Sequence, residues 1–485
     1  MFHRRRTLTL LVLVALAAVF SRAGAGATPQ DQFAEAERLF AEKSYRPAIE
    51  AFGAIFHDPS WPEITRAKAL LRMAEANERI QQWDEAIRLL TDHESSVKIP
   101  IWHGRLLALR GSVALTMPTY YYEKDGVRTR GRWVQGGDYH HDEEANVVAA
   151  LRDLEAAVVQ LRPIVAGMGV VESDADRTTA EISSRAALQY AQALEAFRNS
   201  HGGFKNGIEP SDELVAAHEK FGVGRQLGTD PQAGYRIAEE LAVATGLRAN
   251  AALSRYLQAM YCGRLLEVVS GGVTVLPPDG DGPPMPKRGQ VDPTDPDRTI
   301  WVALPESMNP FAIMKSLWRD YPGTDVEDDG YLAYANLAAR YERYVEAERV
   351  ASELLDRFPR SFWRSDAEAL LQEIRFPMLQ IEDPRPALPG EKVALSVSTR
   401  NVSKLRFQVW KFDLGGVLES RSYLRDDDAN FAALAEIVKK SSQVGDRIGR
   451  PDQSFVRETP DRGEHRFREM EVPLDLRGQR LPHRG

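Results

Sequence analysis

The side chains best suited to metal binding are two histidines followed by three acidic residues, His140-His141-Asp142-Glu143-Glu144. Imidazole and carboxylate groups are common metal ligands, but they must converge on one point to form a coordination sphere. Neighbouring residues at the start of a predicted helix point in different directions, and the helix dipole favours acidic residues in a first turn. We therefore interpret this cluster as a helix start and predict no metal site in it.

Other signatures of catalysis are missing from the sequence. Asp426-Asp427-Asp428 and the five aspartates between residues 279 and 297 lack the spacing and the terminal glutamate of an EF-hand loop. The sequence contains no Gly-x-Ser-x-Gly elbow, no phosphate loop ending in Gly-Lys-Ser/Thr and no His-Glu-x-x-His helix. We predict a protein that is not an enzyme and that binds no cofactor and no metal.

Cys262 is the only cysteine of the chain. A single cysteine excludes an intramolecular disulfide, so stability must come from apolar burial. Cys262 lies in the apolar periodic run Ala251–Val269. We therefore predict a buried and chemically inert thiol.

The amino terminus has the order of a secretory signal peptide. The basic segment His3–Arg6 precedes the apolar run Thr7–Phe20, and Ala23-Gly24-Ala25 or Ala25-Gly26-Ala27 fits the small-x-small cleavage rule. This order predicts a signal peptide at residues 1–27 and export to the periplasm, the cell envelope or the extracellular space. The alternative is an uncleaved anchor, although the run is shorter than the ~20 residues of a spanning helix.

Composition narrows the choice of partners. The chain has 62 basic and 70 acidic residues and a net charge of −8. It therefore lacks the basic field that recruits nucleic acid, and we predict no nucleic-acid partner. We expect membrane contact only through an uncleaved N-terminal segment.

Two stretches near the amino terminus share one pattern of small and large residues at a spacing of thirty-eight. Each copy has a small residue in a first helix, a large aromatic residue at the turn, and an alanine where a second helix must approach closely. Self-similarity at a period of roughly 20–50 residues is typical of stacked helical units. The matched pairs are Ala36 and Ala74, Tyr45 and Trp83, Ala48 and Ala86, Ile49 and Ile87, and Phe52 and Leu90.

A third copy is predicted at Asp328–Arg357, with either Tyr341 or Tyr344 as its turn aromatic. Together with Pro59, which ends the first copy, the pattern resembles the tetratricopeptide repeat. That resemblance implies antiparallel helix pairs stacked into a superhelix whose concave face binds peptides or partner proteins. The spacing of thirty-eight exceeds the ~34 residues typical of the family, which implies a longer loop after the first copy. The packing residues expected in the third copy are Tyr334, Tyr344, Ala347 and Ala351.

Residues 118–142 interrupt the helical pattern with aromatic residues, arginines and glycines. The Asp125-Gly126 pair between β-favouring residues predicts a short hairpin or an ordered insertion. Tyr, Trp and Arg dominate protein-binding hot spots, so this cluster is a candidate partner-binding patch. The alternative is that the insertion caps the solenoid with a small core of its own. The candidate residues are Tyr120, Tyr121, Tyr122, Arg128, Arg130, Arg132 and Trp133.

The remaining sequence up to Arg375 is mainly helical, and residues 32–375 form one predicted tetratricopeptide-like region with insertions at 118–142 and 271–299. Residues 271–299 are rich in proline, glycine and aspartate, which predicts an extended surface loop or linker, with a polyproline II docking segment as the alternative. Further helices are predicted at Trp102–Leu115, Glu143–Val165, Arg177–Arg198, Asp212–Phe221, Pro231–Thr245, Leu247–Val269, Asn309–Asp320 and Ser365–Ile374.

The helical period ends at Arg375 and gives way to alternation. Apolar residues occupy every second position in Val393–Val397 and again in Leu405–Val409. This is the period of half-buried antiparallel strands. We predict a mostly α protein, a tetratricopeptide-like α-solenoid of antiparallel helix pairs, followed by a partial antiparallel β-sandwich.

The β-region resembles the first macroglobulin-type domain of bacterial alpha-2-macroglobulins. The resemblance covers residues 379–476 and implies a macroglobulin-type β-domain at 376–476. We expect this domain to be incomplete, because residues 477–485 form an atypical basic tail without alternation. The motifs that carry the resemblance are Pro389-Gly390-Glu391, the strand that follows, Arg400-Asn401-Val402, the strand Phe407–Asp413, the helical excursion Asn430–Lys440 and the strand Glu469–Leu476.

Members of that family trap proteases through a bait segment and, in many cases, a thioester built on Cys-x-Glu-Gln. Cys262 is followed by Gly263-Arg264-Leu265, so the thioester motif is absent. The resemblance implies an exported, non-enzymatic protein-binding scaffold, the N-terminal part of an alpha-2-macroglobulin-like endopeptidase inhibitor without bait or thioester in this chain. Expected partners are proteins or extended peptides, proteases among them. The alternative is a stand-alone tetratricopeptide scaffold that assembles cell-envelope complexes.

Overall fold

A computed structural model describes residues 29–201, 210–267, 269–270, 273–276, 300–303, 305–382, 393–409 and 453–474. The predicted signal peptide, the helical excursion at 430–440 and the tail at 477–485 lie outside these ranges. The chain divides into two compact units, Met1–Gly330 and Tyr331–Gly485, each treated below by itself. Among the helices of the described ranges, none is both long and apolar enough to span a bilayer.

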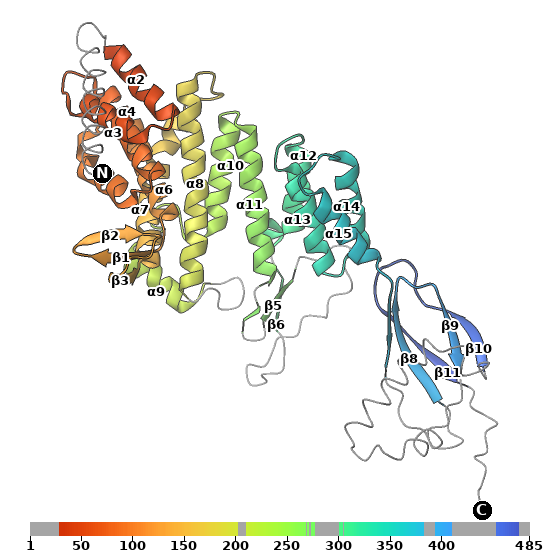
Figure 1. Ribbon diagram of the computed structural model, residues 1–485. Coiled ribbons are helices and arrows are strands. Elements are labelled where there is room, and N and C mark those ends of the chain that lie inside the picture. Colours follow the sequence, from red (N-terminus) through yellow and green to blue (C-terminus); the bar gives the residue numbers. More distant parts are fainter. Residues whose placement is uncertain are drawn as a thin grey trace, which may run out of the picture. The chain divides into compact units, whose positions relative to one another are not determined.

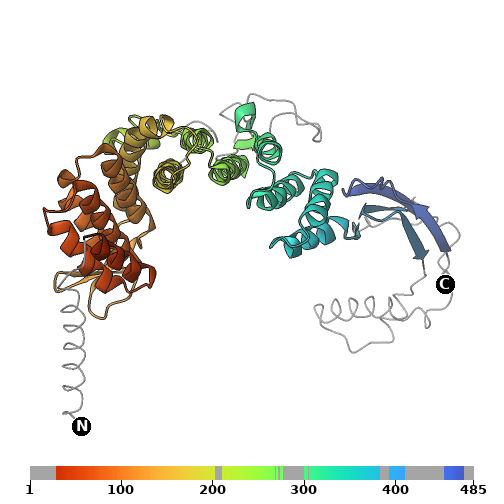
Figure 2. The ribbon, with the colours of Figure 1, turned by 90° about the horizontal axis from the view of Figure 1, so that it is seen from above.

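The fold is mostly helical, as predicted, with packed helix pairs followed by small antiparallel sheets (Figure 1). Viewed from above, α8, α10 and α11 lie side by side, nearly end-on (Figure 2, yellow to green). The helices of the first unit are α2 (Pro29–Ala41), α3 (Tyr45–His57), α4 (Glu63–Arg79), α5 (Trp83–Asp92), α6 (Pro100–Thr116), α7 (Glu143–Ala166), α8 (Asp174–Ser200), α9 (Asp212–Phe221), α10 (Pro231–Ala244), α11 (Arg248–Glu267) and α12 (Pro310–Asp320), with a short 3-10 helix η1 (Glu94–Ser96).

The repeated helix pairs share one turn geometry. Lys43 ends α2 with a left-handed φ of 61°, and Gln81 ends α4 with a φ of 65°. In each turn the next N–H donates to a carbonyl five residues back, at 2.9 Å from Ser44 and 2.8 Å from Gln82. This is the Schellman arrangement that closes a helix. Glu342 has the same geometry between α13 (Glu327–Arg340) and α14 (Tyr344–Arg357), with a φ of 55°.

The predicted packing residues occupy equivalent places in the three pairs. Tyr344 is the first residue of α14, as Tyr45 is of α3 and Trp83 of α5, which identifies Tyr344 as the third turn aromatic. These three aromatic residues are partly buried. The other predicted packing residues are buried, namely Ala36, Ala48, Phe52, Ala74, Ala86, Leu90, Tyr334, Ala347 and Ala351.

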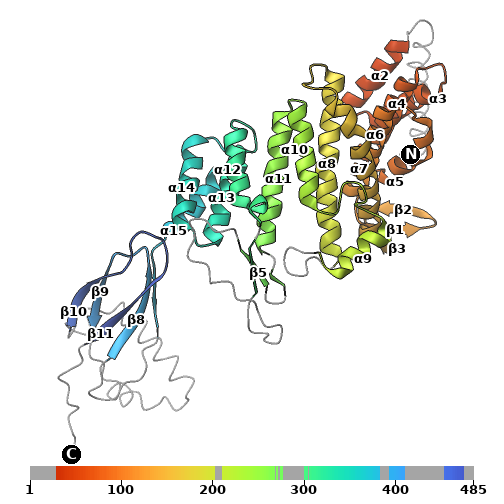
Figure 3. The ribbon, with the colours of Figure 1, turned by 180° about the vertical axis from the view of Figure 1, so that it is seen from behind.

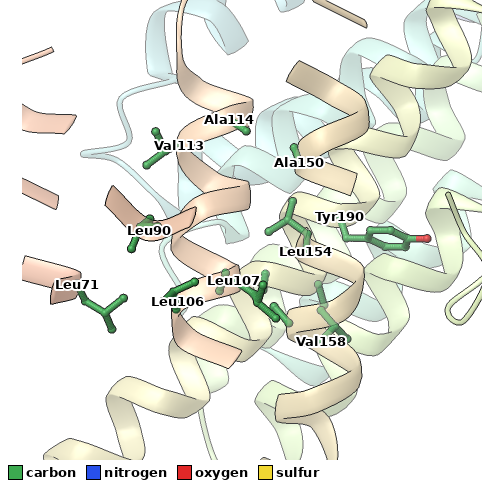
Figure 4. Close-up of a cluster of buried hydrophobic side chains, with 14 of the residues drawn as sticks. Leu71, Leu90, Leu106, Leu107, Val113, Ala114, Ala150, Leu154, Val158 and Tyr190 are labelled. Carbon is green, nitrogen blue, oxygen red and sulfur yellow. The ribbon is translucent and has the colours of Figure 1, made fainter. Parts of the chain in front are cut away.

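The core of the first unit is densest between α6 and α7. Gly104 and Gly111 of α6 lie so close to α7 that an added Cβ would meet Leu161 and Leu154 at 2.7 Å. Glycine normally weakens a helix interior, so close approach of the two helices accounts for both positions. Figure 4 shows the surrounding buried side chains, including Leu106, Leu107, Val113, Ala114, Ala150, Leu154, Val158 and Tyr190.

The insertion between α6 and α7 is a three-stranded antiparallel sheet with the order β2-β1-β3. Asp125 and Gly126, with φ values of 53° and 74°, form the predicted hairpin turn between β1 (Tyr120–Lys124) and β2 (Val127–Arg130). One expectation is wrong here. The two histidines expected at the start of a helix end β3 (Asp138–His141) instead, because they pair with Tyr120 and Tyr121 of β1.

The expected loop at 271–299 contains a strand at its start, so that prediction is wrong for residues 273–276. β5 (Val273–Leu276) pairs antiparallel with β4 (Val269–Ser270) and parallel with β6 (Ile300–Ala303). The β-branched residues Val273 and Val275 favour a strand, and the proline-rich composition begins only at Pro277. Residues 277–299 lie outside the described ranges.

The second unit joins helices to two small sheets (Figure 3). α15 (Arg364–Arg375) is followed by the three-stranded sheet β11-β8-β7 and the two-stranded sheet β10-β9. The two predicted alternating strands therefore lie in different sheets. β7 and β10 were not predicted. The strands are β7 (Met378–Ile381), β8 (Val393–Arg400), β9 (Lys404–Val409), β10 (Gln453–Glu458) and β11 (Arg468–Leu474).

A hydrogen-bonded joint links the strands to the helices within this unit. Asn401, in the turn after β8, donates to the Ile374 carbonyl at 2.6 Å and to the Phe376 carbonyl at 3.0 Å. The His465 ring lies between Asn401 Oδ1 at 2.7 Å and Glu348 Oε2 of α14 at 2.9 Å. The last carbonyl groups of α15 are thus capped by the β-region rather than by water.

Candidate functional site

Among the described residues, no group of three or more His, Cys, Asp or Glu side chains could hold a metal ion. Cys262 is fully buried in α11, and burial raises the pKa of its thiol to about 12. A thiol with that pKa is protonated and unreactive at neutral pH. The candidate sites are two surface cavities and the exposed residues of the insertion.

Two of the predicted site residues belong to the structural core of the insertion. Tyr121 is buried and stacks on His140 at a centroid distance of 4.8 Å. Arg130 is also buried, lies 5.1 Å from the Tyr121 ring, and forms ion pairs with Asp84 at 2.8 Å and Asp142 at 3.5 Å. These contacts favour the alternative interpretation for both residues, in which they hold the insertion together.

The other predicted residues of the insertion remain available to a partner. Trp133 is 71% exposed and Tyr120 is 37% exposed. Tyr122 is partly buried and contacts Tyr139 edge-on, with ring centroids 5.6 Å apart. Arg128 and Arg132 are exposed.

Arg128, Arg130 and Arg132 line a cavity of about 770 Å³, which we call the insertion cleft. Its remaining walls come from the first two helix pairs, so neither the insertion nor the helices alone would form it. From the helix pairs, the apolar lining consists of Ile49, Met73, Ile80, Trp83 and Leu89, and the polar lining consists of Arg46, Glu50, Asn77, Gln81, Gln82, Asp84 and Glu85; Thr129 is a further lining residue of the insertion.

A second cavity of about 510 Å³, the inner groove, lies among the first helices of successive pairs. α2, α4, α6 and α8 all contribute to it. Its lining combines apolar, charged and uncharged polar residues, namely Phe33, Glu37, Lys68, Leu71, Arg72, Glu75, Trp102, Arg105, Ala108, Leu109, Ser112, Asp174, Ala175, Thr178, Glu181, Ile182, Arg185 and Gln189. None of these residues was predicted as a binding residue.

Two arginines of the inner groove have different partners. Arg72 pairs with Glu37 at 3.0 Å and with Glu75 at 2.7 Å. Arg105 instead stacks on the Trp102 ring, with its guanidinium 4.1 Å from the ring centroid. Its Nε atom is buried without a hydrogen-bond partner among the described residues. Burial lowers the pKa of Arg105 below the usual arginine value, which reflects the free energy needed to keep this charge away from water.

The sequence contains a partial signal for the inner groove. Trp102 and Arg105 are three residues apart in a predicted helix and therefore lie on one face. Nothing local distinguishes that pair from a packing pair, because the groove also requires α8, which lies more than sixty residues downstream.

The chain was compared with protein-family models and with curated proteins. Neither comparison finds a match.

Proposed function

We propose that this chain is a non-enzymatic scaffold that binds an extended segment of a partner protein in the inner groove. The observation that supports the proposal most directly is Arg105, a guanidinium held half-buried on Trp102 in an open cavity, which forms no ion pair with a described carboxylate although the charge of Glu75 acts on it. An unpaired buried charge destabilises a fold. A carboxylate of a bound peptide would supply the missing partner.

The groove also offers apolar contacts for such a segment. Phe33, Leu71 and the Trp102 ring contribute to its walls, and aromatic residues and arginines dominate the binding energy of most interfaces. The sequence resemblance to the tetratricopeptide repeat, whose concave face binds peptides or partner proteins, also supports a binding role.

The proposal can be tested with peptides selected from a phage-displayed random library on the full chain. We expect selected peptides to carry acidic residues and to lose at least tenfold in affinity against Thr178→Trp, which fills the groove from α8. The matched control is Gln192→Trp, an exposed position of α8 that does not line the groove. Equal binding to both variants, or no enrichment of acidic peptides, would contradict the proposal.

A second candidate function is participation in a protease inhibitor of the alpha-2-macroglobulin type. Its support is the sequence resemblance, together with the presence of β8, the Asn401 turn and β11 at the positions where strands and a connection are expected. Because the chain lacks a thioester motif, we expect it to bind proteases or their substrates without trapping them. A trapped protease would still cleave a small substrate but would no longer reach a protein substrate, and we expect this chain to leave both activities unchanged.

A further inference from the structure

The insertion cleft is built as a rigid site. Arg130 ties β2 to α5 through Asp84, and Arg132 Nη2 donates to Gln81 Oε1 at 2.7 Å at the turn that precedes α5. The wall formed by the insertion and the wall formed by the helices are thus fixed relative to each other. A site whose walls are fixed before binding loses little conformational entropy when a partner docks.

The strand that borders the cleft lies at the edge of its sheet. In the order β2-β1-β3, β2 pairs with β1 on one side only. Because the hairpin loop has two residues, Thr129 lies in a hydrogen-bonded pair with Tyr122, and the Gly131 N–H donates to the Tyr120 carbonyl at 3.1 Å. The backbone N–H groups of Arg128 and Arg130 therefore point away from β1. Neither has a backbone acceptor among the described residues.

The charges around the cleft favour an acidic partner. Of its carboxylates, Asp84 pairs with Arg130 and Glu85 pairs with Arg88, which leaves Glu50. Among the arginines that line the cleft, Arg46 and Arg132 are exposed and form no ion pair with any described residue.

The cleft also has an apolar anchor at its edge and an apolar wall inside it. Trp133, 71% exposed, directly follows Arg132 in the chain, and Val127 at the start of β2 is 65% exposed. Met73, Ile80 and Leu89 line the cavity itself. An extended chain that alternates acidic and apolar residues would place one set near the arginines and the other against these side chains.

We propose that the insertion cleft is a second protein-binding site, which takes an extended segment with alternating acidic and apolar residues as an added strand beside β2. Strand addition supplies affinity through main-chain hydrogen bonds, while alternate side chains supply specificity. This site shares α4 with the inner groove but has no lining residue in common with it, so it does not depend on the function proposed for the groove.

The test uses the full chain and two fluorescein-labelled probes, (Glu-Val)4 and (Lys-Val)4, in a fluorescence anisotropy titration. We expect (Glu-Val)4 to saturate with a Kd below about 1 mM and (Lys-Val)4 to bind at least tenfold more weakly. The double variant Arg46→Glu/Arg132→Glu should weaken (Glu-Val)4 binding at least tenfold. The control Arg177→Glu, at an exposed position of α8 that lines neither cavity, should leave it unchanged.

A backbone variant separates strand addition from charge alone. Arg128→Ala removes the side chain, while Arg128→Pro also removes the outward N–H, which an edge strand tolerates. We expect Arg128→Pro to bind (Glu-Val)4 at least threefold more weakly than Arg128→Ala, with the same far-UV circular dichroism spectrum. Equal affinities of the two variants would overturn strand addition. Failure of (Glu-Val)4 to saturate, or equal affinities of the two probes, would overturn the proposed site. Thr178→Trp, which fills the inner groove, should leave the affinity for both probes unchanged.

Discussion

Helix α6 carries one arginine on each of two sides, and the two arginines differ in their contacts with carboxylates. Toward α7, Arg110 forms two 2.7 Å contacts with Asp153 and one 2.6 Å contact with Glu94 of η1. Toward the inner groove, Arg105 rests on Trp102 and forms no ion pair with a described carboxylate, although the charge of Glu75 acts on it. We infer that the α6–α7 side carries stability, whereas the groove side keeps a charge for the proposed partner. Variants of each side should therefore separate stability from binding.

The largest expected effect is on the α7 side. Arg110→Met keeps much of the side-chain volume but leaves Asp153 half-buried without its partner. We expect the free energy of unfolding to fall by about 3–5 kcal/mol, the usual result of breaking a buried pair from one side. Urea unfolding followed by far-UV circular dichroism measures the change. Arg110→Lys, which keeps the charge, should recover part of the lost stability. An unchanged urea midpoint for Arg110→Met would contradict a stabilising role for the α7 side.

A smaller loss is expected from added volume between α6 and α7. Gly111→Ala places a methyl group 2.7 Å from Leu154, so overpacking should lower the free energy of unfolding by about 1–3 kcal/mol. Gly53 of α3 is the matched control, because its added Cβ would meet Met73 at an ordinary 3.6 Å. There the gain in helix propensity should stabilise the protein by about 0.5–1 kcal/mol. If both alanine substitutions changed the free energy of unfolding in the same direction, close approach of α6 and α7 would not explain the glycine at position 111.

The paired side should also depend on pH. Burial alone would raise the pKa of the Glu94 carboxyl, but hydrogen bonds from Arg110 and His103 lower it below the ordinary value. A lowered folded-state pKa gives stability that is present above the unfolded pKa and is lost as pH falls through the folded pKa. We expect the stability difference between wild type and Arg110→Met to narrow below about pH 4.5. A stability difference between the two proteins that stays constant from pH 7 to pH 3 would exclude a contribution from ionised Glu94.

The smallest effect on stability is expected in the inner groove. Arg105→Gln removes both the cost of burying this charge and its contact with the Trp102 ring, and because these two effects oppose each other the free energy of unfolding should change by less than about 0.5 kcal/mol. The same variant should lose most of its affinity for the acidic peptides selected on the groove. Thermal unfolding and peptide titration of one preparation give both values. A stability loss above about 2 kcal/mol would mean that Arg105 serves the fold.

The repeated helix pairs could be predicted from sequence because their signals are local. The small residues at Ala36 and Ala74, the turn aromatics and the following alanines lie within one helix pair each, and the Asp125-Gly126 turn is equally local. Such patterns fix the turn and the buried face without knowledge of the rest of the chain.

The candidate sites depend on residues far apart in sequence and could be predicted only in part. The insertion suggested Arg128 and Arg132 by composition, but Tyr121 and Arg130 proved to be buried by contacts with strand β3 and helix α5, which composition does not reveal. Strand β5 was not predicted because its β-branched run is short and is followed directly by prolines, which favour a loop. The inner groove requires four helices, so no single window contains it.

The joint between α15 and the β-region has a mechanical consequence. A tension applied along the chain would pass from the strands through the Asn401 side chain to the last carbonyl groups of α15, and through His465 to α14, as well as through the backbone at Phe376. Several hydrogen bonds loaded together must then break before the strands separate from the helices. We expect force spectroscopy to record their separation as one event, and Asn401→Ala to lower the rupture force.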